Sequence, residues 1–187
     1  CSATMASPRS PWRSTDGFIW TNVSDLTGFP FVFNRTMLGV APSNENVVYA
    51  IAETPGSGFH TTYAGASEDH SFFKYTYISG DGSGTGGICE NRSSNLPAFG
   101  QPVGEFASQG GYDLFVKVKP DDENVVFLGG TDLFRSTDGF ETNTNTAWIG
   151  GYATSNNVSQ YPNHHPDQHA LVFSQTSSTT MWSGNDG

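Results

Sequence analysis

The chain has 187 residues, enough for one ordinary domain, and its 18 acidic against 8 basic side chains give a formal net charge of −10. This surplus of carboxylates excludes a nucleic-acid-binding surface, because phosphates require a basic face, and it disfavours docking to anionic lipid. Aromatic residues at 13%, 22 glycines and no apolar run of about 20 residues favour many short strands joined by tight turns, with no insertion into a membrane.

The first clear signal is the stretch Arg-Ser-Thr-Asp-Gly-Phe at residues 13–18, which follows an irregular segment with prolines at 8 and 11. Asp-Gly favours a tight β-hairpin turn, because Gly17 takes positive φ without strain and the Asp16 carboxylate accepts bonds from nearby amides. Ser14 can bind the backbone in the same local way. We expect a strand over 18–23, with Trp20 packing back over the turn.

A second sequence pattern, found in two copies, predicts a strand, a turn and a strand. It covers residues 38–52 and returns at 114–130, with Pro42 matching Pro120 and Val47-Val48-Tyr49 matching Val125-Val126-Phe127. The β-branched and aromatic residues of both copies are strand formers. A looser third copy covers 169–184. These phrases make the chain a repeat protein.

The hexapeptide itself recurs unchanged at 135–140, with Ser136, Asp138 and Gly139 in the turn. A degenerate copy of the motif follows a predicted strand over 72–78. Ser79 and Asp81 keep the spacing of the motif, a Gly/Ser insertion follows, and Cys89 takes the position of the tryptophan. The turns therefore begin at 14, 79 and 136, a period of about 60 residues. This period is longer than that of the common propeller repeats, and we expect longer loops to account for the difference.

The pattern Ser-x-Asp-x-Gly-x-x-Trp resembles the Asp-box, or BNR repeat, of sialidases, xyloglucanase-type glycosidases, sortilin-like receptors and many secreted bacterial proteins. The first copy matches at Ser14, Asp16 and Trp20, with Gly17 one place early. The second copy has no tryptophan, and Thr142-Asn143 stand there. The resemblance covers most of residues 12–187 and is nearest to the sortilin-like and xyloglucanase-like proteins of bacteria. It implies a structural role for the box and predicts fold better than function.

The expected fold is an all-β, partial propeller of four-stranded antiparallel blades, about three of them. The blade segments are approximately 1–36, 37–100, 101–160 and 161–187, within a single domain that is cut at both ends. A propeller closes with typically 4–8 blades. We therefore expect the remainder of the same propeller, or neighbouring protein chains, to complete the ring.

The most unusual stretch lies at 161–169, where three of the five histidines gather around prolines. His165, Asp167 and His169 are candidates for a metal site, because imidazole and carboxylate bind Zn²⁺. His165 and His169 are also candidate ligand contacts. A third reading, buried polar groups that fix a loop, stays open. The phrase Asp-x-His before this strand, with Gly-Asn-Asp-Gly at 184–187, resembles a phrase of secreted Asp-box propellers.

Three carboxylates outside the boxes, Asp113, Asp167 and Asp186, are the catalytic candidates, because glycoside hydrolysis uses a pair of carboxyl groups. Tyr112, just before a predicted inner strand, is a candidate ligand contact, although a turn with a packed aromatic is the alternative. The arginine cluster of a sialidase is not found in this sequence, nor are nucleophile elbows, phosphate loops, Cys-x-x-Cys pairs or EF-hand loops. No cofactor is expected apart from a metal ion.

These observations favour a non-enzymatic extracellular or cell-surface propeller that acts in adhesion, assembly or binding of glycans or proteins. The alternative is a xyloglucanase-like glycoside hydrolase acting on polysaccharide, with one of its two carboxylates outside this sequence. Cys1 resembles the lipid-bearing cysteine of a mature bacterial lipoprotein, and a disulfide between Cys1 and Cys89 is the other role open to these two residues.

Overall fold

The computed structural model describes residues 12–23, 29–153 and 159–187, and in these ranges the regular structure is β-sheet with two short 3₁₀ turns and no α-helix. All strand pairs are antiparallel. The prediction of an all-β fold is confirmed. No helix in the described ranges is long and apolar enough to cross a membrane.

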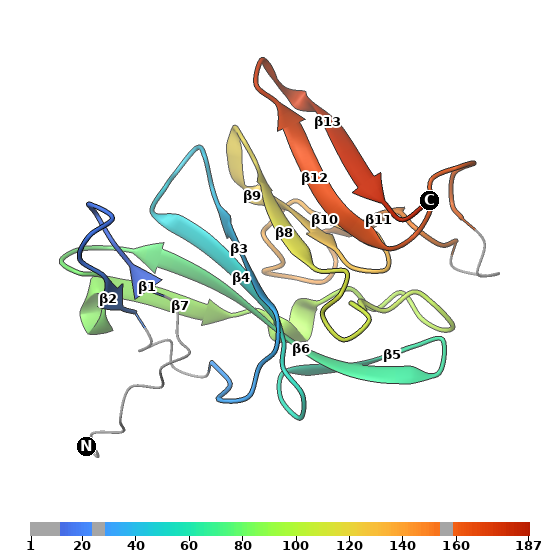
Figure 1. The fold of residues 1–187 in the computed structure, drawn as a ribbon, viewed down its shortest axis with the longest axis horizontal. Coiled ribbons are helices and arrows are strands. Elements are labelled where there is room, and N and C mark those ends of the chain that lie inside the picture. Colours follow the sequence, from blue (N-terminus) through green and yellow to red (C-terminus); the bar gives the residue numbers. More distant parts are fainter. Residues whose placement is uncertain (1–11, 24–28, 154–158) are drawn as a thin grey trace.

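Four sheets follow one another along an arc (Figure 1). The first hairpin pairs β1 (Trp12–Arg13) with β2 (Thr21–Asn22). A five-stranded sheet then contains β3 (Thr36–Val40), β4 (Val47–Glu53), β5 (Phe59–Tyr63), β6 (Ala66–Tyr77) and β7 (Gly87–Asn91). Its strands run in the order β3-β4-β6-β5, and β7 pairs with residues 73–77 of β6, farther along that strand than β5, which pairs with residues 66–70. The 3₁₀ turns are η1 (Gly84–Gly86) and η2 (Ser93–Asn95).

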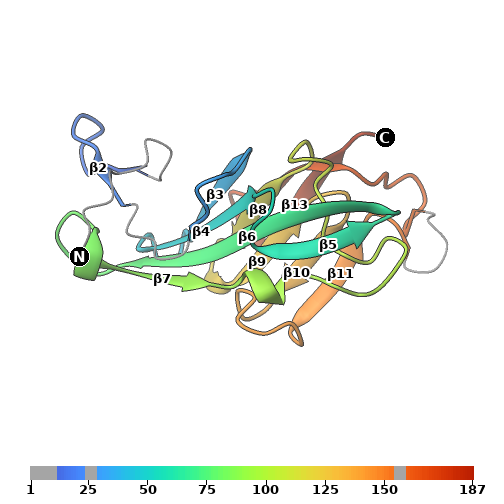
Figure 2. The ribbon, with the colours of Figure 1, turned by 90° about the horizontal axis from the view of Figure 1, so that it is seen from below.

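The four-stranded sheet is formed by β8 (Phe115–Lys119), β9 (Asp122–Gly129), β10 (Leu133–Ser136) and β11 (Thr146–Gly150), paired in chain order. The last hairpin pairs β12 (Gln168–Ser174) with β13 (Ser177–Asn185). In both views it lies remote from the first hairpin, which lies against the five-stranded sheet near the C-terminal end of β6 and the start of β7 (Figures 1 and 2).

The main core fills the space between the five-stranded and four-stranded sheets. It holds Tyr49, Ile51 and Phe72 from one side and Val116, Val118, Val126, Leu128, Phe134 and Phe140 from the other. A smaller core between the four-stranded sheet and the last hairpin holds Phe115, Phe127, Leu133 and Leu171. Successive strand residues point to opposite faces, so β9 serves both cores, with Val126 and Leu128 in one and Phe127 in the other.

The repeated phrases adopt the same strand register. Leu38 pairs with Ala50, Val116 with Leu128, and Leu171 with Ser183. The predicted strand–turn–strand units over 38–52, 114–130 and 169–184 are therefore β3–β4, β8–β9 and β12–β13. One expected strand differs: of residues 18–23, only Thr21–Asn22 is strand. The reason is that Asp16 Oδ1 accepts the amides of Phe18 and Ile19, which keeps both residues in the turn.

Candidate functional site

The two unchanged hexapeptides build closely related turns. Ser14 Oγ donates to Asp16 Oδ1 over 3.1 Å, and Ser136 Oγ donates to Asp138 Oδ1 over 2.7 Å. Each serine oxygen also accepts a backbone amide inside the turn, at 2.8 Å in both copies. Gly17 and Gly139 have φ of +76° and +65°, the left-handed region that glycine adopts without strain. In both copies the Asp-box residues hold the turn through local bonds.

The degenerate copy at residues 79–81 departs from this pattern. Asp81 Oδ1 accepts the amide and the hydroxyl of Ser83, and Ser79 contributes its carbonyl, which accepts the Gly82 amide. The Gly/Ser insertion supplies the partner here. Cys89, on β7, is partly buried, and burial raises the pKa of its thiol to about 11, which makes it a poor nucleophile. Cys89 is a free thiol in the structure, without the disulfide to Cys1 that the sequence left open. Cys1 lies outside the described residues, so its lipid anchor stays a prediction.

The candidate site begins with the loop that precedes β8. The Glu68 carboxylate accepts the amides of Ser108 and Gly110, at 2.8 and 3.1 Å. From the other side Arg35 Nη1 donates to the Tyr112 carbonyl over 2.6 Å. The three residues at 109–111 have φ of +51°, +69° and +85°, a left-handed run that the two glycines allow. These bonds fix the direction in which Tyr112 and Asp113 leave the loop.

The last hairpin brings His169 and Asp186 to the same place. The cross-strand pair Gln168–Asn185 positions them at the open end of the hairpin. His169 Nε2 lies 2.5 Å from Asp186 Oδ1 and 3.5 Å from Asp113 Oδ1, so one imidazole stands between two carboxylates. The Tyr112 ring meets the His169 ring edge-on, with centroids 5.1 Å apart. We call Tyr112, Asp113, His169 and Asp186 the Asp113 cluster.

Asp113 is the unusual member. Its side chain is 0% exposed, and neither carboxylate oxygen has a hydrogen-bond partner among the described residues. Burial, followed by the nearby charge of Asp167, raises the pKa of Asp113 to about 7. Asp167 has its own partner, because Gln109 Nε2 donates to its Oδ1 over 2.6 Å.

A second buried carboxyl is that of Asp132, next to Thr131, whose carbonyl accepts the Asp167 amide over 2.9 Å. Asp132 Oδ1 accepts the Tyr152 amide over 2.6 Å, while Oδ2 has no partner within the described part of the chain. Burial raises the pKa of Asp132 to about 8, and the charge of Asp167 adds to this effect. Both Asp113 and Asp132 therefore hold a proton far more readily than an exposed aspartate.

The surroundings of the Asp113 cluster are open to solvent on one side. The exposed fractions are 59% for Tyr112 and, for the side chains of Asp186 and His169, 41% and 32%. A ligand arriving there would meet one aromatic ring and carboxylate oxygens. Such a group of acceptors can bind hydroxyl groups, and a protonated Asp113 can also donate a hydrogen bond.

The remaining histidines of the 161–169 stretch point to other partners. His164 Nε2 lies 3.1 Å from Ser183 Oγ, and His165 Nδ1 lies 3.0 Å from the Pro166 carbonyl. Within 12–23, 29–153 and 159–187 no group of three or more His, Cys, Asp or Glu side chains is arranged to hold a metal ion. The metal role of His165, Asp167 and His169 stays a prediction, and of the three only His169 belongs to the Asp113 cluster.

Sequence reasoning named Tyr112, Asp113, His169 and Asp186 but missed Glu68, Arg35 and Asp132. Glu68 and Arg35 act across 40 to 77 residues of sequence, and no local pattern reveals such partners. Asp132 carried a usable signal: it lies in a short connection between β9 and β10 but belongs to no Asp-box. No family model, curated protein or solved structure matches this chain.

Proposed function

We propose that the four sheets are two whole blades and two half blades, in succession, of an Asp-box β-propeller, and that this propeller is a non-enzymatic, extracellular or cell-surface protein that binds glycans at the Asp113 cluster. The shared register of β3–β4, β8–β9 and β12–β13 supports the first half, because each of these hairpins would be the inner half of one blade. The four-stranded sheet β8–β11, with its Asp-box between β10 and β11, would be one whole blade.

The observation that carries the glycan proposal is the Asp113 carboxylate, which makes no hydrogen bond within the described residues and has only the ion-pair contact with His169 Nε2 at 3.5 Å. Buried polar groups are nearly always hydrogen-bonded, so a hydroxyl donor from a bound molecule would complete this site. A sugar offers several hydroxyl donors at close spacing. It also offers an apolar ring face, which the exposed Tyr112 ring can cover. The net charge of −10 disfavours anionic ligands and leaves neutral glycans favoured.

The test is calorimetric titration of the 187-residue protein with neutral oligosaccharides, using xyloglucan and cellulose fragments. We expect Tyr112→Ala and Asp113→Asn each to weaken binding about tenfold or more, equivalent to about 1.4 kcal/mol. Tyr161→Ala is the matched control, because Tyr161 is similarly exposed, at 50%, and lies outside the cluster. Equal affinity of all four proteins for every fragment would place the glycan site elsewhere and refute this assignment.

One observation favours a second candidate function, hydrolysis of a glycosidic bond. A carboxyl with a pKa of about 7 is still about half protonated at neutral pH, and the protonated form can act as a general acid. Asp186, paired with His169, would be the second carboxylate. If this function is present, xyloglucan gains reducing ends, the rate falls as the pH rises through about 7, and Asp113→Asn removes it. Release that is unchanged in Asp113→Asn would reject Asp113 as the acid.

A further inference from the structure

The two hairpins at the ends of the arc each have one strand without its usual neighbour. In the four-stranded sheet β10 pairs with β11 on one side and β9 on the other. Its repeat equivalent β1 pairs, within the described residues, with β2 alone. Similarly β4 and β9 each have two strand partners, whereas β13 has only β12 in the described part of the chain. An unpaired strand edge is a template for another strand.

We propose that the last hairpin of one copy of this protein adds to the first hairpin of a second copy, so that β12–β13 and β1–β2 form one composite four-stranded blade. This inference rests on the propeller part of the proposed function. The partner is a second copy because the two hairpins are complementary: one is equivalent to β8–β9, the other to β10–β11, and these four strands form the complete sheet.

The repeat fixes the strand register of the composite blade. In the four-stranded sheet Phe134 pairs with Leu128, and Arg135 with Phe127. The unchanged hexapeptide aligns Arg13 with Arg135, and the hairpin register aligns Gly184 with Gly129. Trp12 of one copy should therefore lie opposite Ser183 of the other, and Arg13 opposite Trp182.

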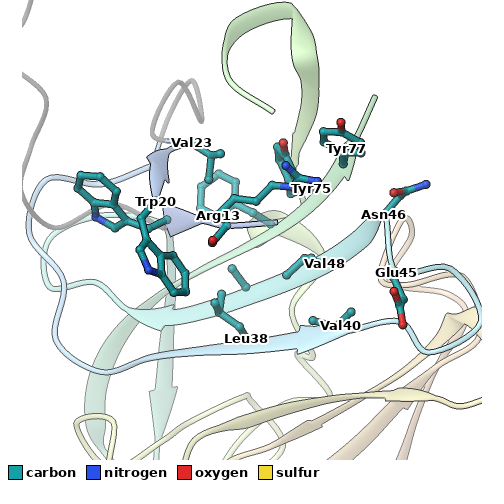
Figure 3. Close-up of a pocket in the computed structure, with 14 residues that line it drawn as sticks. Arg13, Trp20, Val23, Leu38, Val40, Glu45, Asn46, Val48, Tyr75 and Tyr77 are labelled. Atoms are coloured by element: carbon teal, nitrogen blue, oxygen red, sulfur yellow. The ribbon is translucent and has the colours of Figure 1, made fainter. Parts of the chain in front are cut away.

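The face of the five-stranded sheet beside the first hairpin matches this docking. A cavity of about 440 Å³ lies there, between β1–β2 and the strands β3, β4 and β6 (Figure 3). Leu38 and Val40 line it and are 53% and 51% exposed. Their repeat equivalents Val116 and Val118 are 6% and 1% exposed, because they are buried against the neighbouring sheet.

The last hairpin presents the face that would cover this surface. Val116 packs against Gly39 and belongs to the same core as Tyr49. In the repeat, Val172 and Trp182 of the last hairpin are equivalent to Gly39 and Tyr49, and they are 56% and 59% exposed. The apolar face that the cavity lacks is thus the one that β12–β13 leaves open.

For a ring built from these 187 residues alone, the blade count sets the number of copies. Each copy of this chain would supply the five-stranded blade, the four-stranded blade and two halves of composite blades, which is three blades per copy. Two copies give six blades, within the usual 4–8, whereas three copies give nine. Six equal blades place the copies half a turn apart, so a two-fold axis closes the ring without a free edge.

The oligomeric state of the 187-residue protein is the first test, by light scattering after size exclusion. We expect twice the 20.1 kDa of one chain. Trp182→Glu should give a monomer with unchanged far-ultraviolet circular dichroism. Ile88→Glu should stay a dimer, because Ile88 is comparably exposed, at 51%, and pairs with Thr76 on the face away from the cavity. A monomeric wild type, or a dimer that survives Trp182→Glu, would overturn the proposal.

Cysteine cross-linking tests the register in a background of Cys1→Ser and Cys89→Ser. Chains with Trp12→Cys are mixed with chains carrying Ser183→Cys, which should form a disulfide between copies because directly opposed residues share a face. The control mixes Trp12→Cys with Trp182→Cys, where a shift of one residue puts the thiols on opposite faces. The composite blade is rejected if the first mixture forms no disulfide between copies, or forms it no better than the control mixture. Glycan titration reads the Asp113 cluster separately, so the two proposals fail independently.

Discussion

The same six residues, Arg-Ser-Thr-Asp-Gly-Phe, occupy two very different surroundings in this molecule. In the second copy Phe140 is 0% exposed, inside the main core, whereas in the first copy Phe18 is 90% exposed. The serine–aspartate bond and the positive φ of the glycine are present in both. Local sequence therefore determines the turn, and the neighbouring sheet determines whether the turn contributes to a core.

The neighbouring sheet reaches the second copy directly. Arg92, whose side chain is buried, donates from Nη1 to the carbonyls of Asp138 and Gly139, at 3.1 and 2.9 Å. Asn95 Nδ2 donates to the Phe140 carbonyl over 3.1 Å. The hydrogen bonds described for the first copy all stay within residues 14–19. The outer turn of one sheet is thus secured by the sheet before it.

The largest difference between the copies should appear on removal of the phenylalanine ring. Phe140→Ala leaves a cavity in the main core and should lower the free energy of unfolding by about 3–5 kcal/mol. Phe18→Ala should change it by less than about 0.5 kcal/mol, as expected at an exposed position. Both are measured by urea denaturation in a Trp182→Glu background, which keeps a second copy from covering Phe18. Similar losses in the two variants would contradict the comparison.

Removal of the turn carboxylate should have a smaller effect. Asp138 accepts the Ser136 hydroxyl, the Thr142 amide and hydroxyl, and Asn145 Nδ2, so Asp138→Ala leaves several donors without a partner. We expect a loss of about 1–3 kcal/mol.

Asp16→Ala is the matched variant. It also removes amide acceptors, but in a turn that water reaches freely, and the expected loss is below about 1 kcal/mol. Thermal denaturation of the two variants beside the wild type decides the order. An unchanged melting midpoint in Asp138→Ala would refute the structural role of the second Asp-box.

The turn in the first copy also shows what sequence could predict and what it could not. Asp-Gly and the flanking strand formers predicted the hairpins correctly, because these signals are local. The hairpin β5–β6 was missed over residues 59–71, where polar side chains hide the alternation although Thr61 and His70 are buried. Burial there depends on a loop far along the chain: Thr61 Oγ1 donates to the Phe106 carbonyl, and His70 Nε2 lies 2.7 Å from Ser108 Oγ.

The candidate site was predictable only residue by residue. Asp113 and Asp186 were named as carboxylates outside the Asp-boxes and His169 as part of the histidine-rich stretch, but nothing in the sequence placed one imidazole between two carboxylates. That arrangement needs the loop at 108–113 and the last hairpin to meet, and Glu68 and Arg35, which hold the loop, come from the five-stranded sheet. Long-range contacts of this kind leave no periodic signal.

The smallest expected effect is the pH dependence of the second turn. Burial alone would raise the pKa of Asp138, but the bonds from Ser136, Thr142 and Asn145 outweigh it and lower that pKa to about 2. A carboxylate whose folded-state pKa lies below its usual 3.8 stabilises the protein fully above pH 3.8, and this contribution is lost as the pH falls to about 2. Asp138→Asn removes the charge at every pH.

The difference between the melting midpoints of wild type and Asp138→Asn should therefore be constant above about pH 5 and shrink towards pH 2. A gap that does not change with pH would mean that the shape of the side chain, and not its charge, holds this turn.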